Sequence, residues 1–143
     1  MRKSVSTIAI IAVLFVGWCQ RNASNDIFGP LPSGNEAIAV AFREQISGVQ
    51  VTGEGVVTRI LPDDEEGRRH QRFILSLESG QTLLIAHNID LAPRMIFLEP
   101  GDLIRFNGVY EWKPEGGVVH WTHHDPRGKH EAGWLKRNGE TFQ

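Results

Sequence analysis

The stretch LEPGDLIRFNGVYEW, residues 98–112, decides the fold of this 143-residue chain. A Pro-Gly turn signal opens it, and Ile104, Phe106 and Tyr110 then recur at even spacings. Side chains two or four apart in a strand point to the same face, so this spacing predicts a strand over residues 102–112 with one buried face. We therefore expect the core to be built from β-strands.

Four further segments share these strand features and are bounded by Gly, Pro, Asn or Ser-Gly turn signals. They predict strands at residues 49–61, 71–78, 81–88 and 117–123. Two glycines in the first of these, Gly53 and Gly55, indicate a bulge or a tight bend.

One amphipathic helix is predicted ahead of the strands, ending at Gly48. Ser33 stands three residues before Glu36, which is the spacing of a capping box. The apolar residues of the run fall on one helical face: Ile38, Ala41, Phe42 and Ile46. We expect this face to cover one end of the following sheet.

The order of these elements is that of an OB-fold: three consecutive strands, a longer connection over residues 89–101, and two more strands. We therefore predict a mainly β protein, a five-stranded OB-fold-like barrel preceded by one amphipathic α-helix. Residues 35–143 form a single domain in this interpretation. A small sandwich or an open five-stranded sheet built from the same strands is the alternative.

Composition limits the function classes. Hydrophobic residues make up 41% and charged residues 22% of the chain, as in a small globular domain, and we expect a monomer. Fifteen Lys and Arg against seventeen Asp and Glu leave no broad basic field, so we expect no duplex nucleic acid as a partner. The motifs of P-loop nucleotide hydrolases, serine hydrolases and zincins do not occur.

The N-terminus predicts export. Arg2 and Lys3 precede a short apolar run, so residues 1–19 are interpreted as a signal peptide and the polar, Gly- and Pro-containing residues 20–34 as a linker. Cys19, the single cysteine, stands where a lipoprotein signal places its lipidated residue, although Trp18 before it is bulkier than that signal requires. We expect a periplasmic or secreted protein, with a lipid anchor at Cys19 as the alternative to ordinary cleavage.

Four sequence segments carry a resemblance to a known family. HQRFIL (70–75), AHNIDLAPR (86–94), HWTHHDP (120–126) and GWLKRNGETFQ (133–143) resemble a family of small exported bacterial proteins classed as a domain of unknown function. The resemblance covers residues 48–143. It implies bacterial export and assigns no activity, substrate or catalytic residue.

The candidate site lies in residues 116–134, which hold four of the six histidines. Histidine serves as acid, base or metal ligand near neutral pH, so this density predicts chemistry. One hypothesis is a divalent metal such as zinc, held by His123, His124 and Asp125. The spacing of His120 and His123 counts against a regular strand site, because residues three apart point to opposite faces.

The metal-free hypothesis pairs His87 with His120 as acid and base, because the third and fifth strands of an OB-fold meet. Arg72 and Arg94 are the candidate clamps for an anion. His87 is also in phase with apolar strand neighbours, so the alternative is a buried histidine hydrogen-bonded to backbone or to Asp90.

Three further residues are candidate ligand contacts: Trp121 as a stacking platform, and Asp90 and His70 as polar partners. Two functions follow from these candidates. The first is an exported hydrolase-like enzyme acting on a phosphodiester or another anionic substrate. The alternative is a noncatalytic OB-type module that binds an oligosaccharide, a peptide or single-stranded nucleic acid.

Overall fold

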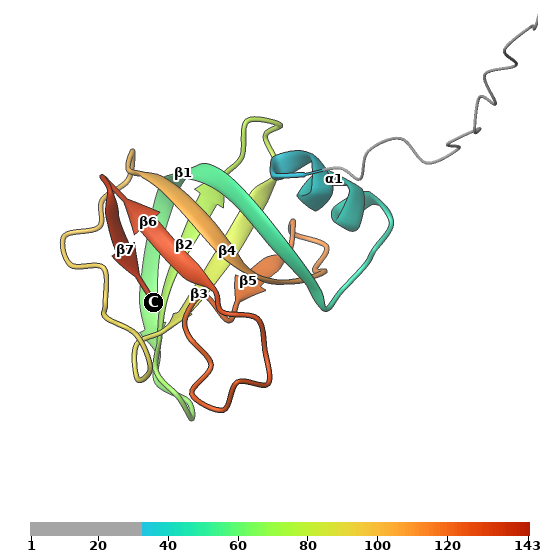
Figure 1. Ribbon diagram of the computed structural model, residues 1–143. Coiled ribbons are helices and arrows are strands. Elements are labelled where there is room, and N and C mark those ends of the chain that lie inside the picture. The colour runs from blue at the N-terminus through green and yellow to red at the C-terminus, as the bar shows by residue number, and fades with distance from the viewer. Residues whose placement is uncertain (1–32) are drawn as a thin grey trace, which may run out of the picture.

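A computed structural model describes residues 33–143 of the chain. One short helix is followed by strands only (Figure 1). The elements are α1 (Asn35–Arg43), β1 (Val49–Asp64), β2 (His70–Ser76), β3 (Thr82–Asn88), β4 (Leu103–Glu111), β5 (Val118–His120), β6 (Trp134–Arg137) and β7 (Glu140–Phe142). The predicted mainly β fold with one preceding helix is confirmed.

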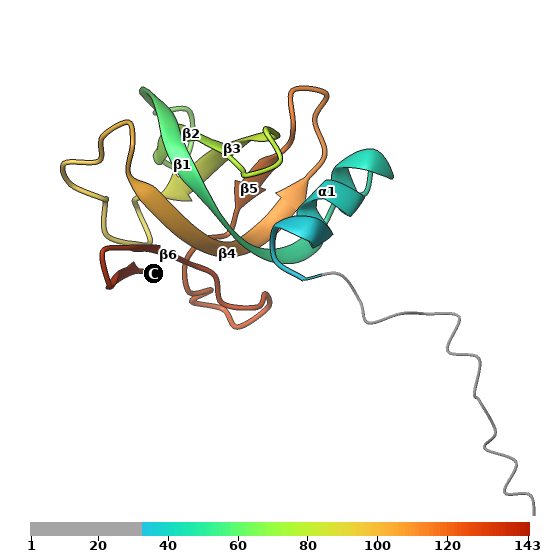
Figure 2. The same cartoon turned by 90° about the horizontal axis from the view of Figure 1, so that it is seen from above.

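Five strands form a closed ring of pairings (Figure 2). β1, β2 and β3 follow one another as an antiparallel meander, and β3 then pairs in parallel with β5. β5 pairs with β4, and β4 returns to β1 over eight residue pairs from Val49 with Tyr110 to Val56 with Leu103. An open five-stranded sheet, the alternative from the sequence, is wrong because β4 closes onto β1.

The long strand β1 changes partner part-way along its length. It pairs with β4 up to Val56 and with β2 from Val56 onward, with register shifts beyond Val57. Gly53 lies where a Cβ atom would come within 2.8 Å of side-chain atoms of Ile38 and Phe106, so only glycine fits between the helix and the core. The bulge predicted at Gly53 and Gly55 is not found there, because both residues pair with β4 in unbroken register; Gly53 instead allows the close approach of α1.

The helix covers one end of the ring, as the sequence predicted. Ile38 and Ala41 are buried in the core that also holds Phe106 and Val51. Two details of the prediction are wrong. Gly34 is the N-cap and no side chain caps the helix, so Ser33 forms no capping box, and the helix ends at Arg43 rather than at Gly48.

The C-terminal hairpin of β6 and β7 was missed in the sequence interpretation. Its turn is Asn138-Gly139, and both residues have positive φ, of 52° and 83°. Asn-Gly between two short apolar runs is a strong hairpin signal, because the two residues accept this backbone conformation at low cost. The hairpin packs Leu135 and Phe142 onto the core and pairs with the middle of β4.

A buried amide holds the connection between β3 and β4. The Gln71 side chain donates to the carbonyl oxygen of Met95 (3.0 Å) and accepts from the Met95 backbone N–H (2.9 Å). Gln71 is 3% exposed, so water cannot replace these partners. The connection is therefore fixed to the end of β2 by a pair of buried hydrogen bonds.

Replacing Gln71 by Ala is expected to lower the free energy of unfolding by about 2 kcal/mol, because it leaves two buried backbone groups without partners. Urea denaturation measures this loss. Gln81→Ala is the matched control, because the Gln81 amide bonds one carbonyl, that of Gly116, at a partly exposed position. Equal losses for both variants would contradict the anchoring role of Gln71.

No helix within residues 33–143 has the length and apolar character needed to cross a membrane. The predicted signal peptide, the linker and Cys19 lie outside the described residues, apart from the end of the linker at residues 33 and 34.

Candidate functional site

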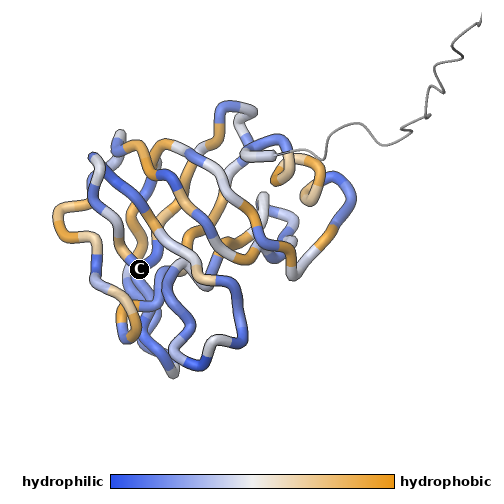
Figure 3. The backbone as a smooth tube through the Cα atoms, viewed as in Figure 1, coloured by the Kyte–Doolittle hydropathy of each residue, from blue (hydrophilic) through white to orange (hydrophobic). Residues whose placement is uncertain are grey.

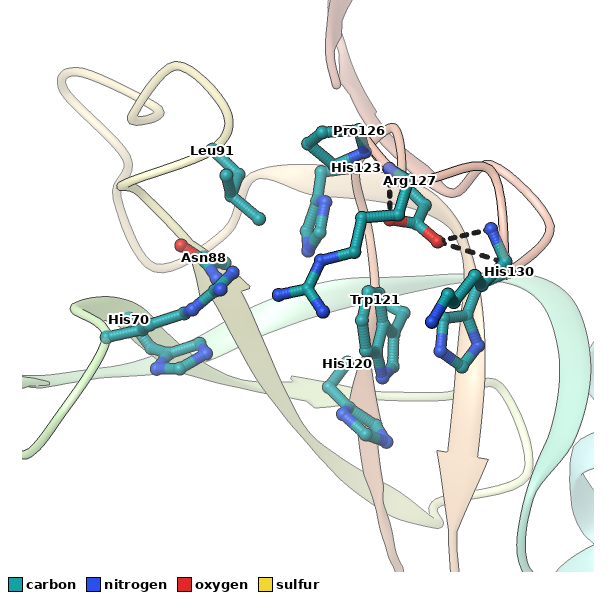
Figure 4. Close-up of a pocket in the computed structure, with 12 residues that line it drawn as sticks. His70, Asn88, Leu91, His120, Trp121, His123, Pro126, Arg127 and His130 are labelled. Carbon is teal, nitrogen blue, oxygen red and sulfur yellow. Dashed lines mark hydrogen bonds between the residues drawn. The ribbon is translucent and has the colours of Figure 1, made fainter.

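A cavity of about 640 Å³ opens at the outer surface where β2 begins and where β3 and β5 end (Figure 4). Two hydrophilic loops border it, residues 65–69 between β1 and β2 and residues 121–133 after β5 (Figure 3). The lining is rich in nitrogen-bearing side chains, namely Arg68, His70, Asn88, His120, Trp121, His123, Arg127, Lys129 and His130, together with Leu91, Asp125 and Pro126.

The carboxylate of Asp125 organises the loop over residues 121–133. Its oxygens accept the backbone N–H groups of Arg127 (2.9 Å), Lys129 (2.6 Å) and His130 (3.0 Å). These three hydrogen bonds stabilise the charged form and lower the pKa of Asp125 below its usual value, the bond from Arg127 being the largest cause. The carboxylate therefore stabilises its own loop, which holds the side chains of Arg127, Lys129 and His130 at the cavity.

A second carboxylate, Asp90, fixes the loop that carries Arg68. It accepts the backbone N–H and the Nε–H of Arg69, each at 2.8 Å, and these bonds lower the pKa of Asp90. The Ile89 N–H also donates to the Arg69 carbonyl oxygen (3.0 Å). Asp90 was predicted to contact a ligand, but it does not line the cavity and instead supports the neighbour of a lining residue.

Trp121 forms part of the cavity wall and stacks on His130, with ring centroids 4.0 Å apart and an interplanar angle of 28°. The ring of His123 also lies close to Trp121, with ring centroids 5.4 Å apart. Trp121 has a φ of 55°, a conformation that costs a residue with a Cβ atom about 1 to 2 kcal/mol. This residue ends β5 three residues earlier than predicted and turns the chain so that Thr122 is buried.

His87 lies inside the ring and does not reach the cavity. Its Nε2 lies 3.0 Å from the Pro93 carbonyl oxygen, which can only accept, so Nε2 carries the proton. Its Nδ1 then accepts from the Thr122 hydroxyl at 2.8 Å. Burial lowers the pKa of His87 to about 4 despite the bond to Pro93. The residue is a neutral, fully satisfied core histidine, bonded to backbone and not to Asp90.

His120 points the other way. In the parallel pairing of β3 and β5, Ile85 lies beside Val119 and both are fully buried, so the next residue of β5 faces outward. His120 lines the cavity and is 34% exposed at its side chain. The expected acid–base pair of His87 and His120 is therefore wrong, because the two imidazoles lie on opposite sides of the sheet.

The Nε2 atom of His120 is buried without a hydrogen-bond partner. Glu111 Oε1 lies 3.5 Å away, a distance at which a hydrogen bond is at best weak. Burial is the largest influence on His120 and lowers its pKa, although Glu111 partly opposes this. A neutral imidazole with one unsatisfied nitrogen is thus present in the cavity wall.

The predicted arginine clamps lie elsewhere. Arg72 donates its Nε–H to the Pro62 carbonyl oxygen (3.0 Å), and Arg94 pairs with Asp63. Cationic groups of the cavity come instead from the two bordering loops: Arg68, Arg127 and Lys129. The sequence did not indicate these three residues because they belong to loops, whose paths no hydrophobic period specifies.

The predicted metal trio does not converge. His123 Nδ1 bonds the His124 carbonyl oxygen (2.6 Å), His124 is exposed outside the cavity lining, and Asp125 is engaged by backbone N–H groups. Across residues 33–143 no group of three His, Cys, Asp or Glu side chains is placed to hold a metal ion. Of the predicted contacts, His70, Trp121 and His120 do share the cavity with His123.

A family model described as "Protein of unknown function (DUF3465)" matches residues 25–143, which is most of the chain. No curated protein matches the sequence.

Proposed function

The chain belongs to this family of proteins of unknown function, and from the geometry of its cavity we propose that it binds a small anionic ligand. The observation that carries the proposal is the charge of the lining. Arg68, Arg127 and Lys129 are cationic at neutral pH, whereas the lining carboxylate, Asp125, is already satisfied by backbone N–H groups. Arginine and lysine at a concave surface are the usual partners of phosphate and carboxylate groups.

Binding is better supported than hydrolysis. Hydrolysis of a phosphodiester needs an acid–base pair or a metal ion at the substrate. His87 is separated from His120 by the sheet, and no metal-ligand trio occurs within residues 33–143. The fixed loop around Asp125 and the strained backbone of Trp121 fit a preorganised binding site instead.

We further propose that the ring of five strands is an OB-type barrel and that the protein is an exported binding module. The pairing order supports the first part, because β1 pairs with β2 and β4, and β3 with β5, as in that fold.

Export is supported by Arg2 and Lys3 ahead of the apolar run in the sequence. Detection of mature protein that begins between residues 19 and 35 in the periplasm or medium tests it.

Replacing Arg127 by Gln is expected to weaken the binding of inorganic phosphate about tenfold at low ionic strength, because one charge-assisted hydrogen bond is lost. Isothermal titration of the full chain measures the change. Arg105→Gln is the control, because Arg105 is an exposed residue of β4 that does not line the cavity. Equal weakening by both substitutions, or no phosphate binding by the unaltered chain, would overturn the proposal.

A further inference from the structure

A second hollow of about 250 Å³ adjoins the cavity on the outer face of β2, β3 and β5. Both hollows are lined by His70 and His120, so these two side chains stand where one opens into the other. The second hollow is completed by Asp64, Ala86, Glu111, Lys113 and Val118. We call the two hollows together the groove; the two histidines stand between its two parts, and it is larger than one phosphate ion needs.

The two ends of the groove carry opposite charge. The larger cavity has the three cationic side chains and one carboxylate, Asp125, which accepts hydrogen bonds from backbone N–H groups of its own loop. The smaller hollow has two carboxylates, Asp64 and Glu111, against one cation, Lys113. One oxygen of Asp64 accepts the Glu66 N–H (3.0 Å), whereas Glu111 has only its 3.5 Å approach to His120. Glu111 is therefore the carboxylate available to a ligand.

The middle of the groove offers polar atoms that suit an amide. The His120 side chain is 34% exposed, although its Nε2 atom is buried and has no hydrogen-bond partner. The imidazole of His70 stands on the same face, and the Asn88 side chain lines the larger cavity beside it (Figure 4). A peptide group presents one donor and one acceptor and matches such a wall.

We propose that the ligand is a zwitterion of the short-peptide class, with its carboxylate among Arg68, Arg127 and Lys129 and its ammonium group beside Glu111. The inference rests on the proposed anion binding and adds that the same ligand carries a positive charge at its other end. A peptide with free termini carries both charges and has amide groups between them. Its ammonium group pairs with Glu111, and its amide groups lie along the wall that holds His70, His120 and Asn88.

The test uses the full chain at pH 7.5 and low ionic strength, with trialanine, N-acetyl-trialanine and trialanine amide as probes in isothermal titration. We expect trialanine to bind at least about fivefold more tightly than either capped peptide, because each cap removes one charge-assisted contact. Glu111→Gln is expected to abolish the preference for trialanine over its N-acetyl form and to leave the preference over the amide. Arg127→Gln is expected to reduce the preference for trialanine over the amide and to leave the preference over the N-acetyl form.

Lys113→Gln is the matched control at the same end of the groove, because it removes a charge that repels an ammonium group. It is expected to preserve or strengthen the binding of trialanine. N-acetyl-trialanine that binds as well as trialanine overturns the inference. If inorganic phosphate binds in an Arg127-dependent way while no peptide binds, the inference fails and the proposed anion site stands. If neither phosphate nor peptide binds, both fail.

Discussion

Acidification from pH 7 to below pH 4 is expected to lower the free energy of unfolding by roughly 3 kcal/mol through a single side chain, His87. In the folded protein, burial lowers the pKa of His87 to about 4 from the ordinary value of 6.5. Between pH 6.5 and about pH 4, His87 of the unfolded chain binds a proton that His87 of the folded protein does not bind. Stability therefore falls as the pH drops through this window, and the full loss is reached below the folded pKa.

Urea denaturation of the unaltered chain and of His87→Gln at pH 7, 5.5 and 4.5 measures this effect. The variant is less stable at pH 7, because the bonds to Thr122 and Pro93 are altered, but its stability is expected to depend less on pH. Other groups with lowered pKa, His120, Asp90 and Asp125, add acid sensitivity to both proteins and cancel in the comparison. His124→Gln is the exposed control. Parallel pH profiles of His87→Gln and the unaltered chain would refute the role of His87.

The ring of strands was predictable because the alternation of apolar and polar residues along each strand indicates which face is buried. The alternation in β2 and β3 places Phe73 and Ile85 inward, and the same alternation places His87 inward with them. In β5, the same alternation places the buried Val119 inward and the next residue, His120, outward. The pairing of these two histidines was predicted from the adjacency of their strands, and adjacency alone does not say which face a side chain occupies.

The cavity was less predictable because loops supply its charges. Whether Arg127 or Arg94 reaches the site depends on the backbone bonds to Asp125 and on the pairing of Arg94 with Asp63. Neither follows from a repeating pattern. The density of histidines did point to the region of this cavity, since His120, His123 and His130 all line it. Their number alone did not separate a metal site from an anion site.

Replacing Gly133 by Ala is expected to abolish measurable phosphate binding and to lower the free energy of unfolding by about 3 kcal/mol, the upper range for overpacking. Gly133 closes the loop that begins at Trp121, and its N–H donates to the His123 carbonyl oxygen (3.0 Å). A Cβ atom there would overlap the carbonyl oxygen of Trp121 and lie 2.7 Å from that of Asn107. Both are backbone atoms of packed segments, so the loop must move.

Movement of this loop separates Trp121 from His130 and displaces Arg127, whereas the pairings among the five strands of the ring involve no residue of the loop. Three measurements on Gly133→Ala follow these consequences. Isothermal titration with phosphate reports the displacement of Arg127, and tryptophan fluorescence reports the separation of Trp121 from His130. Far-UV circular dichroism reports whether the strands are retained. Gly128→Ala is the control in the same loop: Gly128 has a φ of 62° and open space around it, so Ala adds backbone strain of about 1 kcal/mol without overlap. Phosphate binding by Gly133→Ala that matches Gly128→Ala would contradict the prediction, because it would mean that the closed loop is not what holds the cationic side chains at the cavity.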